Sequence, residues 1–333
     1  MTDLSATYMG LKLRNPIIVA SCSLTGNTEG ILRCIEAGAG AVVMKSIFEE
    51  QFVGEAAPSE QLRSIYPEAL DYLREGGLLE YAPQKMCEII EKAKKETDIP
   101  LIASINCQSH KLWPSFAKQF QNAGADGLEL NIYYLPFSLR TPGTEYESFY
   151  LKILEKVKET VSIPVSVKLT SQITSIPYLV HKLEDVGCDA VVLFNWFLQP
   201  DIDTVALKIK NVIGRGNFYQ SLRWVALLAG RVECDIVASG GVQSAEEITK
   251  QILAGASAVQ ICTLFYQKGL QVIKDILGGL KAWMEDHGYS AIEEFKGELS
   301  FEKQTLTFKD PTQAEAYFRA QYLKAFSVGD INA

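Results

Sequence analysis

Two turns, each at the end of an apolar run, have the composition of a phosphate-binding site. Residues 236–239 stop at Gly240 and Gly241, and residues 258–261 stop at Cys262 and Thr263. Paired glycines let backbone N–H groups approach a ligand closely, and the helix-like sequence after each turn would aim a positive helix end at the same place. If the two runs are neighbouring strands, they form one phosphate pocket. A plain strand-to-helix turn is the alternative interpretation of the glycine pair.

Two lysines at the ends of apolar runs are the strongest candidates for chemistry. Lys45 closes residues 41–45, and Lys168 lies near the end of residues 165–169. A lysine is costly to bury without a partner, and an anionic ligand offsets that cost. Lysines beside asparagines and a phosphate site suit a flat cofactor with a phosphate tail, such as a flavin, whose reduced form carries negative charge near N1. Lys168 would instead form a Schiff base in an aldolase, and the residues alone leave both possibilities open.

The elements that would position these residues alternate along the chain. Short, continuously apolar runs are typical of parallel strands covered on both faces, and the segments between them have helical spacing. The expected strands are residues 17–20, 41–45, 101–105, 127–131, 165–169, 190–194, 236–239 and 258–261. The expected helices include residues 82–97, 111–123, 146–160, 176–186 and 244–254.

A weak internal repeat supports this alternation. Gly38, Gly124, Gly187 and Gly255 each end an expected helix and precede an expected strand, where glycine suits a left-handed C-cap. Eight strands alternating with helices favour an α/β fold of the (β/α)8 TIM-barrel type over an open doubly wound sheet. In such a barrel the active site lies at the carboxyl ends of the strands, and the turns after strands seven and eight commonly bind phosphate.

Composition limits the classes of function. The 333 residues are 47% hydrophobic, which is enough for one large core, and the net charge of -8 argues against a nucleic-acid surface. No apolar run is long enough to cross a bilayer, and the N-terminus lacks the pattern of a signal peptide. Seven cysteines without a Cys-x-x-Cys pair favour reduced thiols in the cytoplasm. Three histidines without metal-ligand spacing predict no metal.

Three stretches lie outside the repeat. Residues 48–81 and 195–221 are expected to lie over the mouth formed by the strand ends, where loop variation sets function. The barrel with its inserted loops is expected to span residues 1–290, followed by a C-terminal extension at residues 291–333. Within the extension, the amphipathic residues 311–326 would pack on the barrel or on a second subunit.

Short motifs at the strand ends follow one another in a recognisable order. They are Leu13-Arg14-Asn15-Pro16, Lys45-Ser46, Glu129-Leu130-Asn131, Val167-Lys168-Leu169, Ser239-Gly240-Gly241, Gln260-Ile261-Cys262-Thr263 and Phe295-Lys296-Gly297. In this order they resemble the motifs of the class 1 dihydroorotate dehydrogenases, which are barrels that contain flavin mononucleotide (FMN). The resemblance covers most of residues 5–300.

The resemblance implies which residues bind the cofactor and substrate. The flavin ring and ribityl chain would be lined by Ala20, Ser21, Lys45, Ser46, Asn106, Asn131, Lys168 and Asn195. The phosphate would be held by Ser221, Gly240, Gly241, Cys262 and Thr263, with Cys262 where the family usually has glycine. The substrate would be contacted by Lys45, Asn131, Asn195 and Trp196. The implied reaction is oxidation of dihydroorotate to orotate in pyrimidine biosynthesis, with hydride transfer to flavin N5.

The substrate side departs from the family pattern. The family reads Asn-Leu-Ser-Cys-Pro-Asn after strand four, with the cysteine or a serine as base, whereas this chain reads Asn131-Ile132-Tyr133-Tyr134-Leu135-Pro136. Tyr134 therefore occupies the base position, and Trp196 replaces a small hydroxyl residue. A phenol with an ordinary pKa of about 10 is a poor base at neutral pH but can act as an acid. A different CH–CH or ene substrate, with Tyr134 as the catalytic proton donor, is the alternative function.

Other assignments stay open at this stage. Cys22, Cys107 and His110 are alternative bases, although a buried thiol or a surface histidine is the simpler interpretation of each. A flavin-binding subunit without dihydroorotate activity and a lysine aldolase are alternative functions. The chain has no cysteine cluster for an iron–sulfur centre, so an electron-transfer partner would be a separate chain. A homodimer is expected, with no nucleic-acid or membrane partner.

Overall fold

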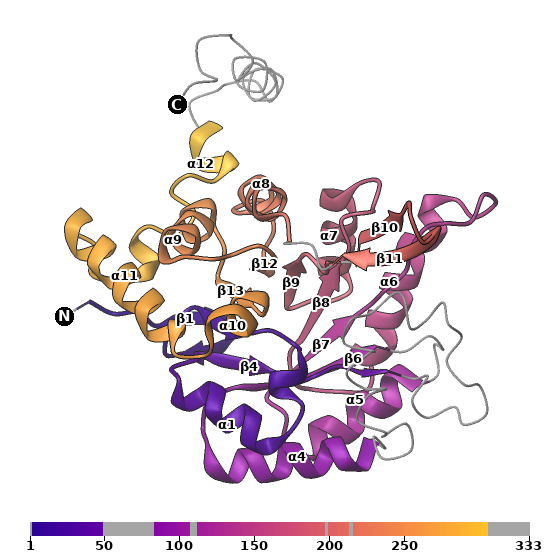
Figure 1. The fold of residues 1–333 in the computed structure, drawn as a ribbon, viewed down its shortest axis with the longest axis horizontal. Coiled ribbons are helices and arrows are strands. Elements are labelled where there is room, and N and C mark those ends of the chain that lie inside the picture. The colour runs from indigo at the N-terminus through magenta and orange to yellow at the C-terminus, as the bar shows by residue number, and fades with distance from the viewer. Residues whose placement is uncertain (1, 49–82, 107–111, 197–198, 213–215, 306–333) are drawn as a thin grey trace.

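Eight parallel strands form a closed barrel surrounded by helices (Figure 1). The computed structural model describes residues 2–48, 83–106, 112–196, 199–212 and 216–305. The strand order is β4-β3-β13-β12-β9-β8-β7-β6-β5, and a pairing between β4 and β6 closes the ring of eight. The short β5 (Ile47–Phe48) pairs with the end of β6. The strands are β3 (Ile17–Val19), β4 (Ala41–Val43), β6 (Leu101–Asn106), β7 (Gly127–Asn131), β8 (Val165–Leu169), β9 (Ala190–Leu193), β12 (Asp235–Ser239) and β13 (Ala258–Ile261). The prediction of a (β/α)8 barrel is confirmed.

Amphipathic helices cover the outside of the barrel. They are α1 (Thr28–Glu36), α4 (Pro83–Glu96), α5 (Leu112–Asn122), α6 (Gly143–Lys158), α7 (Ile176–Asp185), α8 (Phe218–Leu228), α9 (Ala245–Ala254), α10 (Thr263–Lys268) and α11 (Val272–His287). Every residue of β6, β7 and β8 is buried, because one face of each strand meets the barrel interior and the other meets helices. The expected strands and helices agree with the observed ones to within a few residues.

The four glycines of the internal repeat adopt the predicted backbone conformation. Their φ angles are 115° at Gly38, 98° at Gly124, 91° at Gly187 and 118° at Gly255. Residues other than glycine rarely adopt such angles. These four turns therefore fix where four helices stop and the next strands begin.

An N-terminal hairpin closes the amino end of the barrel and was not expected from the sequence. Strands β1 (Ala6–Tyr8) and β2 (Leu11–Leu13) pair antiparallel. The backbone N–H of Met9 donates to Asp235, the first residue of β12, at 2.7 Å. Tyr8 and Leu13 share a buried cluster with inward-facing strand residues. The barrel is thus plugged at this end, and the carboxyl ends of its strands form the mouth at the opposite end.

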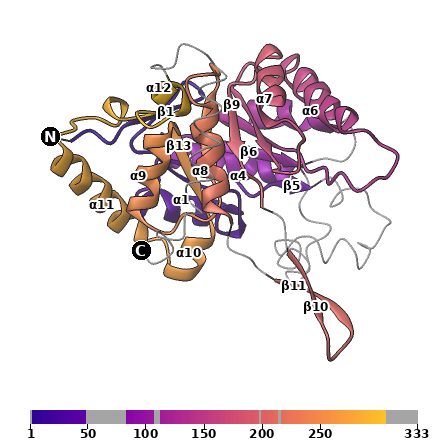
Figure 2. The same ribbon diagram turned by 90° about the horizontal axis from the view of Figure 1, so that it is seen from above.

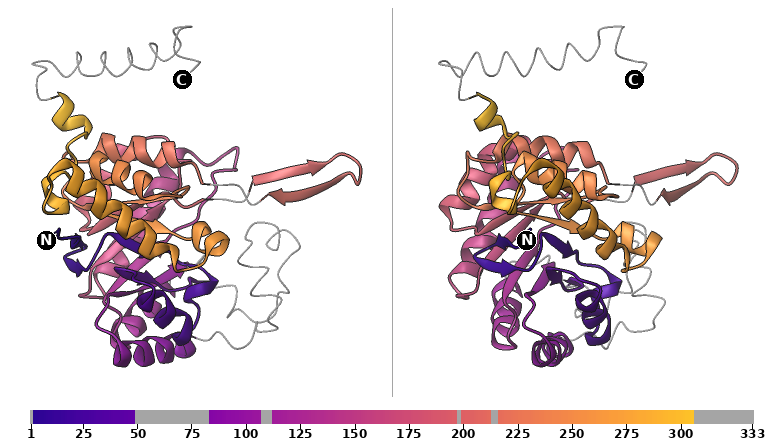
Figure 3. Two further views of the ribbon diagram at one scale, coloured as in Figure 1. Left: turned by 60° about the vertical axis from the view of Figure 1, so that its left-hand side comes forward. Right: turned by 90° about the vertical axis from the view of Figure 1, so that its left-hand side faces the viewer.

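The stretch 195–221, which the sequence predicted to lie over the mouth, contains regular structure. Strands β10 (Gln199–Asp203) and β11 (Lys208–Val212) form an antiparallel hairpin, and α8 already begins at Phe218. The hairpin projects away from the barrel instead of folding over its mouth (Figures 2 and 3). Ile202 and Ile209 pair in register on the hairpin and are both exposed.

The described part of the C-terminal extension lies against α9. Backbone N–H groups of Gly297 and Leu299 donate to the carbonyls of Ile252 and Leu253, and Phe295 is fully buried. A short helix, α12 (Phe301–Thr305), follows. The expected helix at residues 311–326 lies outside the described residues, as does nearly all of the stretch 48–81. Within the described ranges, no helix has both the length and the apolar character needed to cross a membrane.

Candidate active site

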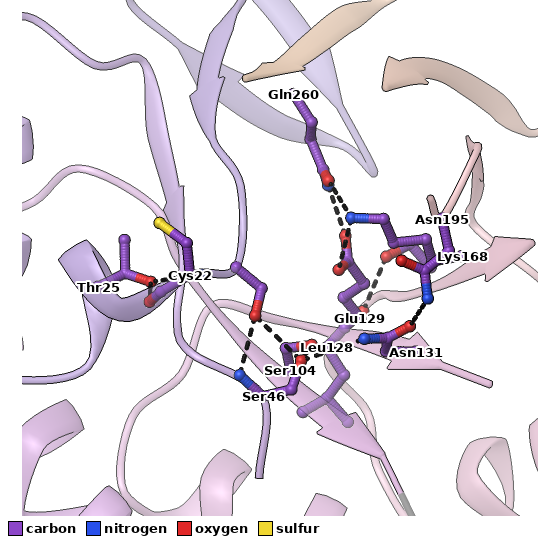
Figure 4. Close-up of polar contacts among 12 residues, drawn as sticks. Cys22, Thr25, Ser46, Ser104, Leu128, Glu129, Asn131, Lys168, Asn195 and Gln260 are labelled. Carbon is purple, nitrogen blue, oxygen red and sulfur yellow. Dashed lines mark hydrogen bonds and ion pairs between the residues drawn. The ribbon is translucent and has the colours of Figure 1, made fainter. Parts of the chain in front are cut away.

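A chain of polar side chains crosses the open mouth of the barrel (Figure 4). The hydroxyl of Ser46 lies 3.0 Å from that of Ser21 and 2.8 Å from that of Ser104. Asn131 donates from Nδ2 to the Ser46 hydroxyl at 3.3 Å, and Asn195 donates from Nδ2 to Oδ1 of Asn131 at 2.7 Å. The structure therefore brings four predicted site residues into one network. Ser104 was missed, and a hydroxyl inside the apolar run of β6 was the available signal.

A buried cluster lies beside this network on the barrel axis. Lys168 of β8 donates from Nζ to Oε1 of Gln260 at 3.0 Å. Gln260 of β13 donates from Nε2 to Oε2 of Glu129, a fully buried residue of β7. Nζ of Lys168 also lies 3.8 Å from Oε1 of Glu129. The prediction named Lys168 alone, although a carboxylate and an amide within apolar strands pointed to the same cluster.

Lys45 and Asn106 stand at the ends of β4 and β6 and are both buried. The stem of Lys45 packs along Gly26, where an added Cβ would lie 3.2 Å from Cδ of the lysine. Nδ2 of Asn106 finds no acceptor in the described part of the chain. A buried amide donor without a partner is costly, and a ligand carbonyl would remove that cost.

The two phosphate-type turns lie side by side, as predicted. Strands β12 and β13 are parallel neighbours, with Ser239 opposite Gln260, so the turns that follow them meet at the mouth. Gly240 and Gly241 have φ angles of 103° and 79°. An added Cβ on Gly241 would lie 2.2 Å from the carbonyl oxygen of Gly216. The glycine pair thus serves the close approach of the loop before α8 as well as any ligand.

The remaining residues predicted to bind phosphate surround these turns. Cys262 caps α10, and Thr263 is its first residue. Ser221 lies in the first turns of α8, where its hydroxyl donates to the carbonyl of Leu193 at 2.7 Å. The hydroxyl proton of Ser221 is therefore used in a hydrogen bond to the end of β9. Its contact with a phosphate stays a prediction.

Tyr134 is held by aromatic packing next to the mouth. Its ring stacks on Phe149 of α6, with centroids 5.1 Å apart and planes 28° apart. The neighbouring Tyr133 is half-buried, and burial raises the pKa of its phenol to about 12. Trp196 follows Asn195 and is 38% exposed. The structure thus places Tyr134 after β7 and against α6, and its assignment to the base position of the family stays a prediction.

Of the three alternative bases, the structure describes Cys22 and leaves the other two untested. Cys22 is buried in the turn after β3, where its backbone N–H donates to the hydroxyl of Thr25. Cys107 and His110 lie outside the described residues. Among the residues that the structure places, no group of three or more His, Cys, Asp or Glu side chains could hold a metal ion.

The donor set at the mouth fits FMN. An ammonium group, hydroxyls and the amide of Asn106, which has no partner among the residues that the structure places, surround the strand ends, and the adjoining glycine turns offer backbone N–H groups. These groups match a flat ring with carbonyl oxygens and a phosphate tail. The fold and this mouth together define the class of the protein, which is a (β/α)8-barrel enzyme.

Comparison with known proteins narrows this class to a family. The family model described as Dihydroorotate dehydrogenase matches residues 3–284. The chain is 30% identical over 306 residues to the catalytic subunit of dihydroorotate dehydrogenase B (NAD(+)) from Thermococcus kodakarensis, covering 89% of this chain and 98% of the relative. The protein of the same name from Thermoplasma acidophilum is 29% identical over 306 residues, with 89% and 99% covered. The chain therefore belongs to the dihydroorotate dehydrogenase family and is a dihydroorotate dehydrogenase-like oxidoreductase.

Proposed function

We propose that the protein is an FMN-dependent oxidoreductase acting on a CH–CH bond next to a carbonyl, with dihydroorotate as the first substrate to test. The observation that carries the proposal is the position of Lys168, whose ammonium is held on the barrel axis beside an amide and hydroxyl network. The names of the relatives, which are catalytic subunits of dihydroorotate dehydrogenase B, support the choice of substrate.

Each group at the mouth has a task in this proposal. FMN, when bound, would supply the hydride acceptor at N5. The ammonium of Lys168 would face the negative end of the reduced ring, and Asn106 would donate to a ring carbonyl. Backbone N–H groups around Gly240, Gly241, Cys262 and Thr263 would hold the phosphate, aided by the start of α10.

Asn131 and Asn195 would orient the substrate. Both amides have fixed orientations, because Nδ2 of Asn195 donates to Oδ1 of Asn131 and Nδ2 of Asn131 donates to the hydroxyl of Ser46. Within the described ranges, the hydrogen bonds of these amides leave one N–H of each and the Oδ1 of Asn195 for a planar substrate with carbonyl and N–H edges. Lys45 and Trp196 would border the same substrate.

A second candidate function is the reduction of an ene substrate with Tyr134 as proton donor. The observation that supports it is the stacking of Tyr134 on Phe149, which would hold the phenol where we expect the thiol or hydroxyl base of the family. In this direction the substrate carbon accepts hydride while the phenol of Tyr134 gives its proton to the neighbouring carbon.

The electron acceptor is proposed to be reached through a separate chain. The relatives are named as catalytic subunits of an NAD(+) enzyme, which supports this view. We also propose a homodimer and a cytoplasmic location, and the barrel of residues 1–290 as the catalytic unit.

Flavin content and dihydroorotate reduction test the proposal. Purified protein should be yellow and should release FMN on denaturation. Colourless protein that cannot be reconstituted with FMN would contradict the cofactor assignment. Anaerobic dihydroorotate should bleach the bound flavin. If the flavin stays oxidised, but dithionite-reduced protein is reoxidised by an α,β-unsaturated ketone such as 2-cyclohexenone, the second candidate replaces the first.

A further inference from the structure

Glu129 is a carboxylate buried completely in the barrel, and the proposed reaction gives it no role. A buried carboxylate is expensive unless it is paired and hydrogen-bonded. Its neighbours are Lys168 at 3.8 Å and the side-chain amide of Gln260. Lys168 is itself 6% exposed and Gln260 is 1% exposed. The three side chains thus form one cluster that is nearly closed to solvent (Figure 4).

The chemistry of the three groups fixes how Gln260 must be oriented. An ammonium only donates hydrogen bonds, and a carboxylate only accepts them. Gln260 therefore turns its carbonyl oxygen to Lys168 and its amide N–H to Glu129, which is the arrangement observed. The amide links the two charges in a single geometry.

Strand register places the carboxylate below the lysine. Lys168 pairs with Asn131 across β7 and β8, whereas Glu129 pairs with Ser166, two residues further from the mouth. The ammonium of Lys168 is therefore drawn toward the axis and downward from its own strand end. One of its three N–H bonds is used by Gln260, so others remain for a group entering from the mouth.

Other ionisable groups around the cluster are identifiable. Lys45 ends β4 and is a second buried cation at the mouth. Tyr8 lies on the side of the cluster that faces the plugged end of the barrel. The pKa of its phenol is raised mainly by burial and further by the nearby charge of Glu129. Among the described residues on β7, β8 and β13, Glu129 is the carboxylate that lies against Lys168.

We propose that Glu129 and Gln260 are positioning residues that keep Lys168 protonated and hold its ammonium at the mouth, where the cofactor would bind. The inference rests on the proposed function for the identity of that cofactor. Its physical basis is that a buried cation without a counter-charge loses its proton instead of remaining charged. Glu129 supplies the counter-charge, and Gln260 prevents the lysine from swinging away.

The first test uses the protein without flavin. Trace acetylation with acetic anhydride modifies neutral amines, and mass spectrometry compares Lys168 with the exposed Lys92 as an internal reference. In Glu129→Gln the modification of Lys168 relative to Lys92 should rise about tenfold or more, because the ammonium becomes a neutral amine. Glu129→Asp should restore protection in part. An unchanged ratio in Glu129→Gln would overturn the proposal, whatever cofactor the protein binds.

The second test measures the midpoint potential of bound FMN against pH in a dye-coupled titration. Above neutral pH the wild-type protein should take up one proton with two electrons, a slope of about 30 mV for each tenfold change in proton concentration. In Glu129→Gln, Lys168 takes up a second proton on reduction, and the slope should double. A potential that rises in the variant with an unchanged slope would show that the lysine stays charged without Glu129, which contradicts the proposal.

Two further variants keep the tests decisive. Glu159→Gln removes an exposed carboxylate that pairs with Lys156 at 3.2 Å, and it should match the wild type in both measurements. Gln260→Met keeps the carboxylate of Glu129 but removes the bridging amide, so the Lys168 side chain can swing away from its counter-charge. If Glu129→Gln does not fold, Gln260→Met should still increase the acetylation of Lys168 several-fold, and no increase would overturn the role of the amide. Absence of flavin from the wild type would contradict the proposed function and leave the acetylation result standing.

Discussion

Nζ of Lys168 lies 3.0 Å from Oε1 of Gln260, although the two residues are separated by 92 positions in the chain. The barrel brings them together because β8 and β13 both end at the mouth with inward-facing side chains. This contact places a cation on the axis of the barrel, and the first of four predictions tests its role.

Lys168→Met removes the cation and is expected to slow flavin reduction by about 10²-fold, the scale found when one electrostatic contact to a developing charge is lost. Stopped-flow absorbance of FMN during anaerobic reduction measures the effect. Lys92→Met, at an exposed position on α4, is the matched control and should leave the rate unchanged. Equal rates in Lys168→Met and the wild type would exclude a role for the ammonium.

Gly241→Ala is expected to abolish FMN binding. A Cβ at this position would lie 2.2 Å from the carbonyl oxygen of Gly216, and the φ of 79° is unfavourable for alanine. Gly278→Ala on α11 is the control, because a Cβ there meets nothing within 4 Å. The control should retain FMN and gain about 0.5–1 kcal/mol of stability, since alanine favours helix over glycine. Full FMN content in Gly241→Ala, measured by flavin release, would contradict the phosphate assignment.

The fold could be predicted from the sequence because each βα unit carries its own local sequence pattern. Apolar runs of strand length and the glycines at positions 38, 124, 187 and 255 mark nearly every boundary. The N-terminal hairpin was missed because Ala6–Tyr8 and Leu11–Leu13 are each only three residues long. Such short strands form because the barrel end buries Tyr8 and Leu13, and that tertiary contact leaves no periodic pattern.

The site could be predicted from the sequence only in part, because some of its contacts are also set by tertiary structure. Polar residues at strand ends were recognisable, and Ser21, Ser46, Asn131 and Asn195 do form one network. Glu129 and Gln260 lie inside strands, where the sequence shows a charge or an amide but not its partner. Which side chains meet across a barrel depends on strand order and register, and a single sequence does not display either.

Stability is expected to fall in alkaline solution because of buried thiols. Burial raises the pKa of the Cys188 thiol from 9.0 to about 12, and it raises the pKa of the Cys34 thiol from 9.0 to about 12 as well. A raised pKa means that the folded state holds the proton longer than the unfolded state. The stabilisation of the folded state by each protonated thiol is fully present below pH 9 and is lost as the pH rises from 9 toward 12.

Cys188→Ser tests this pH dependence. A serine hydroxyl can keep the hydrogen bond to the carbonyl of Ala190 but does not titrate in this range. The slope of unfolding free energy above pH 9, from urea titrations, should flatten by about 1.4 kcal/mol per pH unit. An identical slope in the variant and the wild type would show that Cys188 is not protected from ionisation by the fold.

Tyr134→Phe separates the two candidate substrates. If the phenol donates a proton to an ene substrate, its removal should lower turnover about 10²- to 10⁴-fold, the usual contribution of a general acid. Phenylalanine preserves the stacking on Phe149, so FMN content and thermal stability should not change. Tyr133→Phe is the neighbouring control and should retain turnover. The measurement is the reoxidation rate of reduced enzyme by the ene substrate across pH 6–9. If Tyr134→Phe turns over as fast as the wild type, the proton must come from another group, and Cys107 and His110 become the next residues to substitute.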